Sequence, residues 1–135
     1  MIEYKKDCQI DSKNLKALYD SVGWTAYTQD LIGLEKAITH SLYVVSAWYK
    51  DQLVGLIRVV GDGYTILYIQ DILIHPDFQR EKIGTVLMRD VLETFKHVRQ
   101  KVLLTVDAPD VRGFYESFGF ESCDRGSTVA FYKEF

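Results

Sequence analysis

The pattern of apolar positions changes its period in the middle of the chain. The run 64–74 is rich in β-branched and aromatic residues and predicts a long strand, which His75-Pro76 ends because proline cannot donate to a ladder. After a polar stretch, 77–82, apolar residues recur at helical spacing: Ile83, Leu87, Met88, Val91, Leu92, Phe95 and Val98. The pattern therefore predicts a strand that leads into a helix through a short polar loop.

This predicted junction has the features of an anion site. The first turn of a helix presents backbone N–H groups without helical partners, and the helix dipole attracts negative charge to them. Arg80 and Lys82 add positive charge, and Gly84 lets a ligand approach the backbone closely. The stretch predicts a phosphate site, although it has neither a P-loop pattern nor a G-x-G-x-x-G pattern.

The remaining pattern predicts a mixed sheet with helices. Helical spacing indicates three more helices, at 12–22, 29–40 and 109–118. Short β-prone runs indicate further strands, at 2–5, 42–49, 52–60, 101–106, from 120 onward and at 128–135. Asp62-Gly63 is a two-residue hairpin signal, and the later strand–helix–strand order implies a parallel crossover. We expect an α/β (α+β) fold with four helices and a mostly antiparallel sheet of about seven strands.

Composition narrows the classes of function. The 135 residues are 47% hydrophobic and carry a formal charge of −3, so we expect one domain over 1–135 with no nucleic-acid or anionic-membrane partner. No apolar run approaches the roughly 20 residues that span a bilayer, and the N-terminus lacks the apolar core of a signal peptide. A cytoplasmic protein is expected. Two cysteines and three histidines, all scattered, predict neither a disulfide framework nor a metal site.

Two motifs, QREKIG at 79–84 and FYESFGF at 114–120, occur in this order of elements, and together they resemble the GNAT superfamily of N-acetyltransferases. The first is the acetyl-coenzyme A loop of that family, Q/R-x-x-G-x-G/A, which is similar to QREKIG at 79–84. The second is a late helix ending in L/F-Y-x-x-x-G-F, which is similar to FYESFGF at 114–120. Two positions depart from the family pattern, because Lys82 replaces the first glycine of the loop and Ala108 replaces a frequent asparagine.

The resemblance implies acetyl-coenzyme A as cosubstrate, with no metal. It implies that the pyrophosphate lies on the amides of 80–85 and that the pantetheine runs along the end of the 64–74 strand like an added strand. The cofactor-binding residues implied in this way are Ile72, Leu73, Ile74, Gln79, Arg80, Lys82, Ile83, Gly84 and Thr85.

Tyr115 is the first catalytic candidate. By the family motif, its phenol protonates the thiolate that leaves when an amine attacks the thioester. From spacing alone, Tyr115 is also compatible with a core aromatic residue whose hydroxyl bonds to the backbone.

Asp71 is the second candidate, because it interrupts an apolar row. A two-residue turn at Asp62-Gly63 would place Asp71 opposite Val54, in one row with Leu67, Ile69 and Leu73. One explanation is a β-bulge that turns Asp71 elsewhere. Another is a carboxylate that binds or deprotonates the acceptor ammonium, and a structural hydrogen bond is a third.

Three further residues are candidates for the acceptor site. Gln70 lies where related enzymes often place a base, would face Gly55, and would orient an acceptor rather than ionise. Tyr68 is no convincing base either, so the general base is unassigned. Trp24 and Tyr27 either wall the acceptor pocket or lie at the edge of the core, and the sequence does not separate these alternatives.

The resulting hypothesis is an N-acetyltransferase that moves an acetyl group directly from acetyl-coenzyme A to a primary amine of a small molecule. The alternative is a non-catalytic, coenzyme A-binding regulatory or scaffold module. The sequence does not identify the amine, because loops that vary within a fold build the acceptor site. The aromatic strand expected at 128–135 is one that can pair between subunits, which makes a homodimer possible.

Overall fold

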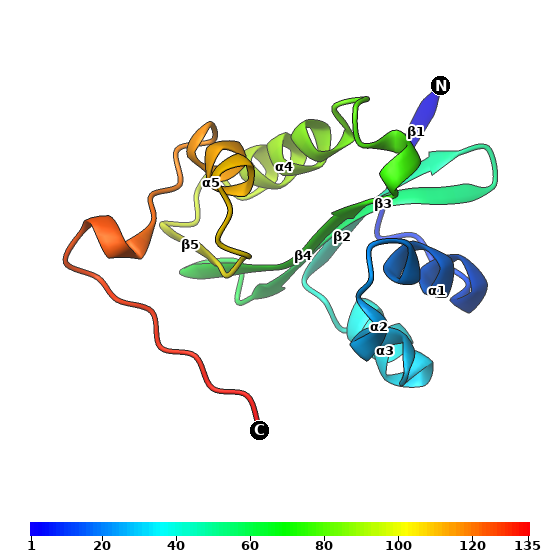
Figure 1. Cartoon of the computed structure of the whole chain (residues 1–135), viewed down its shortest axis with the longest axis horizontal. Helices are drawn as coiled ribbons and strands as arrows, with labels where there is room; N and C mark the ends of the chain where they lie inside the picture. The colour runs from blue at the N-terminus through cyan, green and yellow to red at the C-terminus, as the bar shows by residue number, and fades with distance from the viewer. The chain divides into compact units, whose positions relative to one another are not determined.

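The structure is a computed structural model that describes residues 1–135, and it consists of two compact units. The first unit, Met1–Leu103, contains the sheet and four of the five α-helices, and the second, Leu104–Phe135, contains α5 and a 3₁₀ turn (Figure 1). That both units work as the one domain expected from the sequence stays a prediction.

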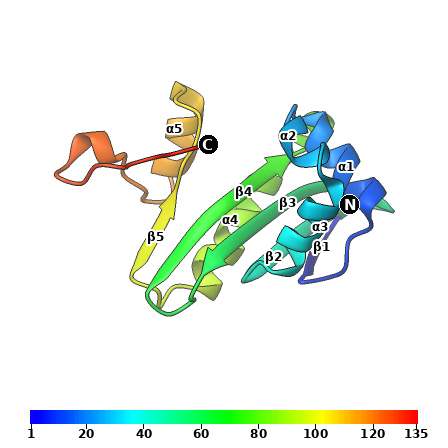
Figure 2. The same ribbon diagram turned by 90° about the horizontal axis from the view of Figure 1, so that it is seen from below.

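The sheet of the first unit has five strands in the order β1-β2-β3-β4-β5 (Figure 2). The strands are β1 (Ile2–Lys6), β2 (Tyr43–Tyr49), β3 (Gln52–Gly61), β4 (Ile66–Ile74) and β5 (Gln100–Leu103). Neighbours are antiparallel except β4 and β5, which are parallel. The mixed, mostly antiparallel α/β sheet and the parallel crossover are therefore confirmed.

The helices follow the predicted order, with one addition. They are α1 (Ser12–Ser21), α2 (Thr25–Thr28), α3 (Leu31–Thr39), α4 (Ile83–Thr94) and α5 (Pro109–Glu116), with 3₁₀ helices η1 (Pro76–Phe78) and η2 (Cys123–Arg125). The side chains of Asp11 and Asp30 accept backbone N–H groups in the first turns of α1 and α3, which explains where these helices begin. The single turn α2 is too short for a periodic signal and lies between the two helices that we expected at 12–22 and 29–40. None of the helices combines the length and the apolar character that a membrane-spanning helix needs.

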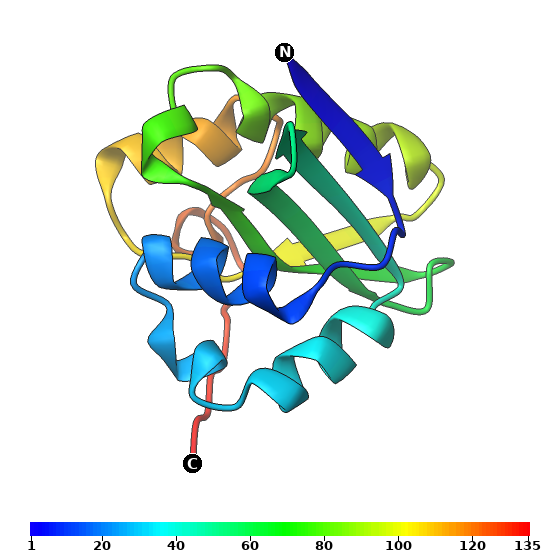
Figure 3. The same cartoon turned by 90° about the vertical axis from the view of Figure 1, so that its right-hand side faces the viewer.

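Helices cover both faces of the sheet in the first unit. The helices α1 to α3 lie on one face and α4 lies on the other (Figure 3). Leu15, Leu18 and Tyr19 of α1 pack in one core cluster with Leu56 of β3 and Leu73 of β4. On the α4 face, a Cβ atom at Gly55 would lie only 3.0 Å from Ile83 Cγ2. A glycine at 55 thus lets α4 approach the sheet closely.

The prediction of seven strands is wrong by two. The segments expected as strands, from 120 onward and at 128–135, form no ladder, and only the short η2 interrupts them. Their β-branched and aromatic residues favour extended backbone, but a strand also requires a neighbour that accepts its hydrogen bonds. Composition alone does not supply that neighbour.

The prediction of a two-residue turn between β3 and β4 is also wrong. The observed turn is longer, and it changes which residues of the two strands face each other. Asp62 accepts the backbone N–H groups of Tyr64, Thr65 and Ile66 at 2.8, 2.7 and 3.1 Å. This side chain wraps the connection into a loop longer than two residues. A hydrogen bond from the Thr65 hydroxyl, followed by these backbone bonds, keeps the pKa of Asp62 well below its usual value. As a result, Asp71 faces Arg58 and not Val54, and Gly55 faces Ile74 and not Gln70.

Candidate active site

A β-bulge in β4 places Gln70 and Asp71. Asp71 pairs with Arg58 and Ile69 pairs with the next residue, Val59, so Gln70 is an extra residue without an opposite partner. An extra residue reverses the side-chain alternation of a strand. Asp71 consequently turns toward α1, and the bulge that the sequence left open as an explanation is confirmed.

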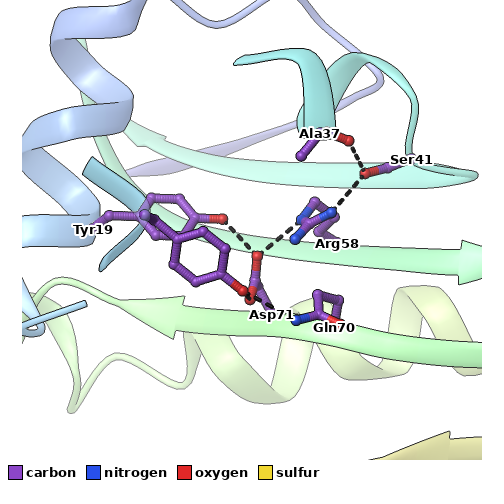
Figure 4. Close-up of polar contacts among 7 residues, drawn as sticks. Tyr19, Ala37, Ser41, Arg58, Gln70 and Asp71 are labelled. Carbon is purple, nitrogen blue, oxygen red and sulfur yellow. Dashed lines mark hydrogen bonds and ion pairs between the residues drawn. The ribbon is translucent and has the colours of Figure 1, made fainter. Parts of the chain in front are cut away.

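Asp71 is the centre of a buried polar network, which Figure 4 shows. Its side chain is 2% exposed. Oδ2 accepts from Arg58 Nε and from the Tyr19 hydroxyl, each at 2.9 Å. Oδ1 accepts from the Tyr27 hydroxyl at 2.7 Å. A carboxylate held by three donors fits the structural role that the sequence left open, and a catalytic role for Asp71 stays a prediction.

The network continues outward from Arg58 and from Tyr27. Arg58 Nη1 is 3.5 Å from Ser41 Oγ, which in turn donates to the carbonyl of Ala37 in α3 at 2.7 Å (Figure 4). Gln70 Nε2 donates to the Tyr27 hydroxyl at 3.1 Å. These bonds tie α1, α2 and α3 to the two central strands, so the network fixes the helices beside the bulge.

Electrostatics keep the donors of this network protonated. Burial, and then the negative charge of Asp71, raise the pKa of the Tyr19 hydroxyl. Burial is also the main cause of the raised pKa of Tyr27. Burial alone would lower the pKa of Arg58, but the Asp71 carboxylate more than offsets it and raises that pKa. At neutral pH both hydroxyls therefore keep their protons, and Arg58 keeps its charge.

Trp24 and Tyr27 extend this region as an aromatic cluster. Their ring centroids are 6.4 Å apart, and Tyr27 meets Tyr19 edge to face at 5.1 Å. Tyr27 is half-buried and Trp24 is exposed. The structure thus brings Trp24, Tyr27, Gln70 and Asp71 together as neighbours, and the use of the first three in binding an acceptor stays a prediction.

The N-terminus of α4 has the geometry of an anion site. Lys82 precedes the helix in the left-handed conformation, with φ 59° and ψ 24°, and its side chain does not cap the helix. The backbone N–H groups of Ile83, Gly84 and Thr85 lie in the first turn, where no earlier carbonyl of the helix can accept them. The side chains of Arg80 and Lys82 are exposed beside them. This arrangement is suited to a phosphate group.

One edge of β4 is open next to this helix start. The strand β5 pairs only with Ile66–Ile69, so no strand of the sheet pairs with Ile72, Leu73 and Ile74 on that side. The Ile74 carbonyl accepts from Gln79 Nε2 at 3.2 Å, which ties the loop to the strand end. An extended ligand could therefore add to this edge as a strand does.

Tyr115 belongs to the second unit. It lies on α5, half-buried, with its ring 5.2 Å from that of Phe114 and 6.0 Å from that of Phe120. Burial raises the pKa of the Tyr115 hydroxyl, and a hydrogen bond with the side chain of Thr105 acts in the opposite direction. The hydroxyl thus has a side-chain partner within its own unit.

The sequence analysis missed three members of the network, Tyr19, Ser41 and Arg58. Arg58 carried the clearest signal, because it is the one charged residue in the apolar run 53–60. A charge there needs an opposite charge, and Asp71 is the one carboxylate within the run 66–74. The sequence thus indicates that Arg58 needs a carboxylate such as Asp71, although it does not show that these two residues face each other.

Comparison with known proteins identifies the family. Residues 27–131 match the family described as Acetyltransferase (GNAT) domain. The chain belongs to the GNAT acetyltransferase family. An uncharacterized N-acetyltransferase, ycf52-like, from Prochlorococcus marinus is 34% identical over 128 residues, which cover 91% of this chain and 69% of that protein. Across four ycf52 and ycf52-like relatives, this GNAT chain spans 62% to 72% of their length.

Solved structures agree with this family. The GNAT family protein SP0256 from Streptococcus pneumoniae is 36% identical, with a TM-score of 0.80 and coverage of 99% of this chain and 100% of that one. An aminoglycoside N-acetyltransferase, AAC(6')-Iy, solved in complex with CoA, has a TM-score of 0.73 at 15% identity, covering 99% and 95% of the two chains. At that identity the second comparison shows the GNAT fold alone.

The GNAT loop explains the backbone of Lys82. In the family pattern this position is the first glycine, and the chain takes here a φ of 59° that glycine adopts without a steric penalty. Lys82 therefore has a conformation that suits glycine, and it adds a positive charge to the loop.

Proposed function

We propose that this GNAT chain transfers the acetyl group of acetyl-coenzyme A to a primary amine of a small molecule. The observation that carries the proposal is the open edge of β4 at Ile72–Ile74, which is followed, after the loop 75–82, by the uncapped, basic N-terminus of α4. An extended, amide-containing arm that ends in a pyrophosphate fits an open strand edge followed by a basic helix start.

The residues of the first unit would hold the donor in two ways. The amides from Arg80 to Thr85, with the charges of Arg80 and Lys82, would bind the pyrophosphate. The backbone of Ile72–Ile74 would pair with the pantetheine amides. The AAC(6')-Iy structure in complex with CoA supports a coenzyme A site on this fold.

The acetyl-coenzyme A supplies an activated acetyl thioester, and the protein supplies positions and protons. The neutral amine attacks the carbonyl carbon while backbone N–H groups of β4 stabilise the oxyanion. The carbon–sulfur bond then breaks, Tyr115 donates its proton to the sulfur, and the amine nitrogen loses a proton to water. Asp71 stays the second catalytic candidate, although its three donors suit it better to holding Tyr27 and Arg58 than to proton removal.

A screen of amines with detection of free thiol tests this function. The panel should contain amino acids, aralkylamines, polyamines and aminoglycosides, with acetyl-coenzyme A in excess. Thiol release that depends on one class of amine, together with a product heavier by one acetyl group, is the expected result. Binding of acetyl-coenzyme A without turnover across the whole panel would contradict the proposal and favour the non-catalytic, coenzyme A-binding module.

A further inference from the structure

The direction of the hydrogen bonds around Tyr27 follows from Asp71. The Tyr27 oxygen is 2.7 Å from Asp71 Oδ1 and 3.1 Å from Gln70 Nε2. Asp71 also accepts from the Arg58 guanidinium and from Tyr19, and a carboxylate paired in this way only accepts hydrogen bonds. The Tyr27 hydroxyl has one proton, and it therefore donates that proton to Asp71.

This direction fixes the orientation of the Gln70 amide. Once its proton is committed to Asp71, the Tyr27 oxygen can only accept, so it must meet the NH₂ end of the amide. The Gln70 oxygen, Oε1, then lies at the other end. Because Gln70 is the extra residue of the bulge and is exposed, this end is available to a ligand. The bulge thus presents a hydrogen-bond acceptor, not a donor.

We propose that Tyr27 is a positioning residue, which holds the Gln70 amide with Oε1 outward so that Oε1 accepts a hydrogen bond from the amine nitrogen of the acceptor. The inference rests on the proposed function and deepens it. Gln70 precedes Ile72 by two residues, or about 7 Å of strand, so it lies near the β4 edge proposed for the donor. An amide oxygen accepts the N–H group without taking its proton, so Gln70 binds the amine and does not act as the base.

The first test observes the amide in the protein without a ligand. Gln70→Leu assigns the two side-chain N–H signals of Gln70 in a ¹H–¹⁵N spectrum. Tyr27→Phe should shift both signals and speed their exchange with solvent. Tyr64→Phe, which removes the hydroxyl of an exposed tyrosine elsewhere, should leave them unchanged. Unshifted signals in Tyr27→Phe would overturn the proposal. That variant should fold, because Arg58 and Tyr19 still hold Asp71.

The second test is a kinetic cycle. Tyr27→Phe should raise KM for the amine about threefold to tenfold, because a released glutamine must be immobilised when the amine binds. The kcat and the KM for acetyl-coenzyme A should change little. The same Tyr27→Phe substitution is then made in a Gln70→Glu protein. A carboxylate at position 70 has an oxygen at both ends and needs no orientation. An equal rise in KM in both backgrounds would show that Tyr27 acts otherwise than through the Gln70 amide.

Failure of the proposed acetyl transfer and failure of the positioning role of Tyr27 give different results. If no amine is acetylated, the proposed function fails, and the role of Gln70 in binding the amine fails with it. Unshifted amide signals, or an equal rise in KM in an active enzyme, reject the role of Tyr27 and leave the acetyl transfer intact.

Discussion

Arg58 and Asp71 face each other across β3 and β4, with Arg58 Nε 2.9 Å from Asp71 Oδ2. Both side chains are buried, at 8% and 2% exposure, so each is the counter-charge of the other within a largely apolar layer. Removal of one partner of such a pair leaves the other as an uncompensated buried charge. The pair therefore matters to stability because loss of one residue would leave the charge of the other buried and unpaired.

Asp71→Asn should lower the free energy of unfolding by about 3 kcal/mol or more, because it leaves the Arg58 guanidinium buried without a counter-charge. Denaturant unfolding measures this value. Asp90→Asn is the matched control: Asp90 also accepts from a tyrosine, Tyr43, but its cationic partner Lys6 is exposed. That control should cost about 1 kcal/mol or less. A stable Asp71→Asn with reduced kcat/KM would instead place Asp71 in the chemistry.

Gly84→Glu should abolish the stabilisation of the protein by acetyl-coenzyme A. A ligand that binds the folded state at a hundredfold excess over its Kd stabilises that state by about 2.7 kcal/mol, which thermal melts detect. Glutamate at 84 would add bulk and a negative charge beside the pyrophosphate. Gly113→Glu, at a helix position where a Cβ meets nothing within 4 Å, is the control and should keep the shift. An undiminished shift in Gly84→Glu would place the cofactor elsewhere.

Tyr115→Phe should lower kcat about a hundredfold, since general acid catalysis is typically worth 10²–10⁴-fold and a thiolate is a fairly good leaving group. General acid catalysis requires the protonated Tyr115 hydroxyl, so activity should be constant below the pKa of this group and should fall above it. Because burial raises that pKa, the fall should lie above pH 10, the ordinary value for tyrosine. The variant should lose this basic limb of the pH profile and still bind acetyl-coenzyme A. An unchanged kcat and basic limb would make Tyr115 a packing residue.

Lys82→Gly should raise the free energy of unfolding by about 1 kcal/mol, because a left-handed residue other than glycine is strained by roughly this amount. The same substitution removes a charge from the phosphate site, so affinity for coenzyme A should fall and depend less on salt. Lys50→Gly is the control, since Lys50 has a similar φ of 55° in the turn between β2 and β3. It should gain stability without any change in affinity. Equal affinities in all three proteins would remove the Lys82 charge from the site.

The strand and helix that form the candidate cofactor site could be predicted because their signals are local. The change of period between 64–74 and 83–94 and the proline between them lie within one continuous stretch. The anion site follows from the helix start alone, since the free N–H groups belong to any uncapped first turn.

The Asp71 network could not be predicted, because it depends on which residues of two strands face each other. A single side chain, Asp62, enlarges the turn and shifts the register, and the bulge at Gln70 shifts it again. Tyr19 and Tyr27 come from helices whose docking on the sheet is a tertiary event. The expected strand at 128–135 failed for a related reason, since pairing depends on a partner that propensity does not specify.

The bulge at Gln70 divides β4 into two halves whose side chains alternate between the faces of the sheet with opposite phase. Loss of that one residue would restore a single alternation along the strand, and the side chains on one side of the deletion would exchange faces. Asp71 would then leave Arg58, or Ile69 would leave the α4 side. The length of β4 is therefore constrained at this point independently of which side chain stands at position 70. When relatives are aligned, a one-residue gap here would mark a repacked molecule and not a harmless deletion.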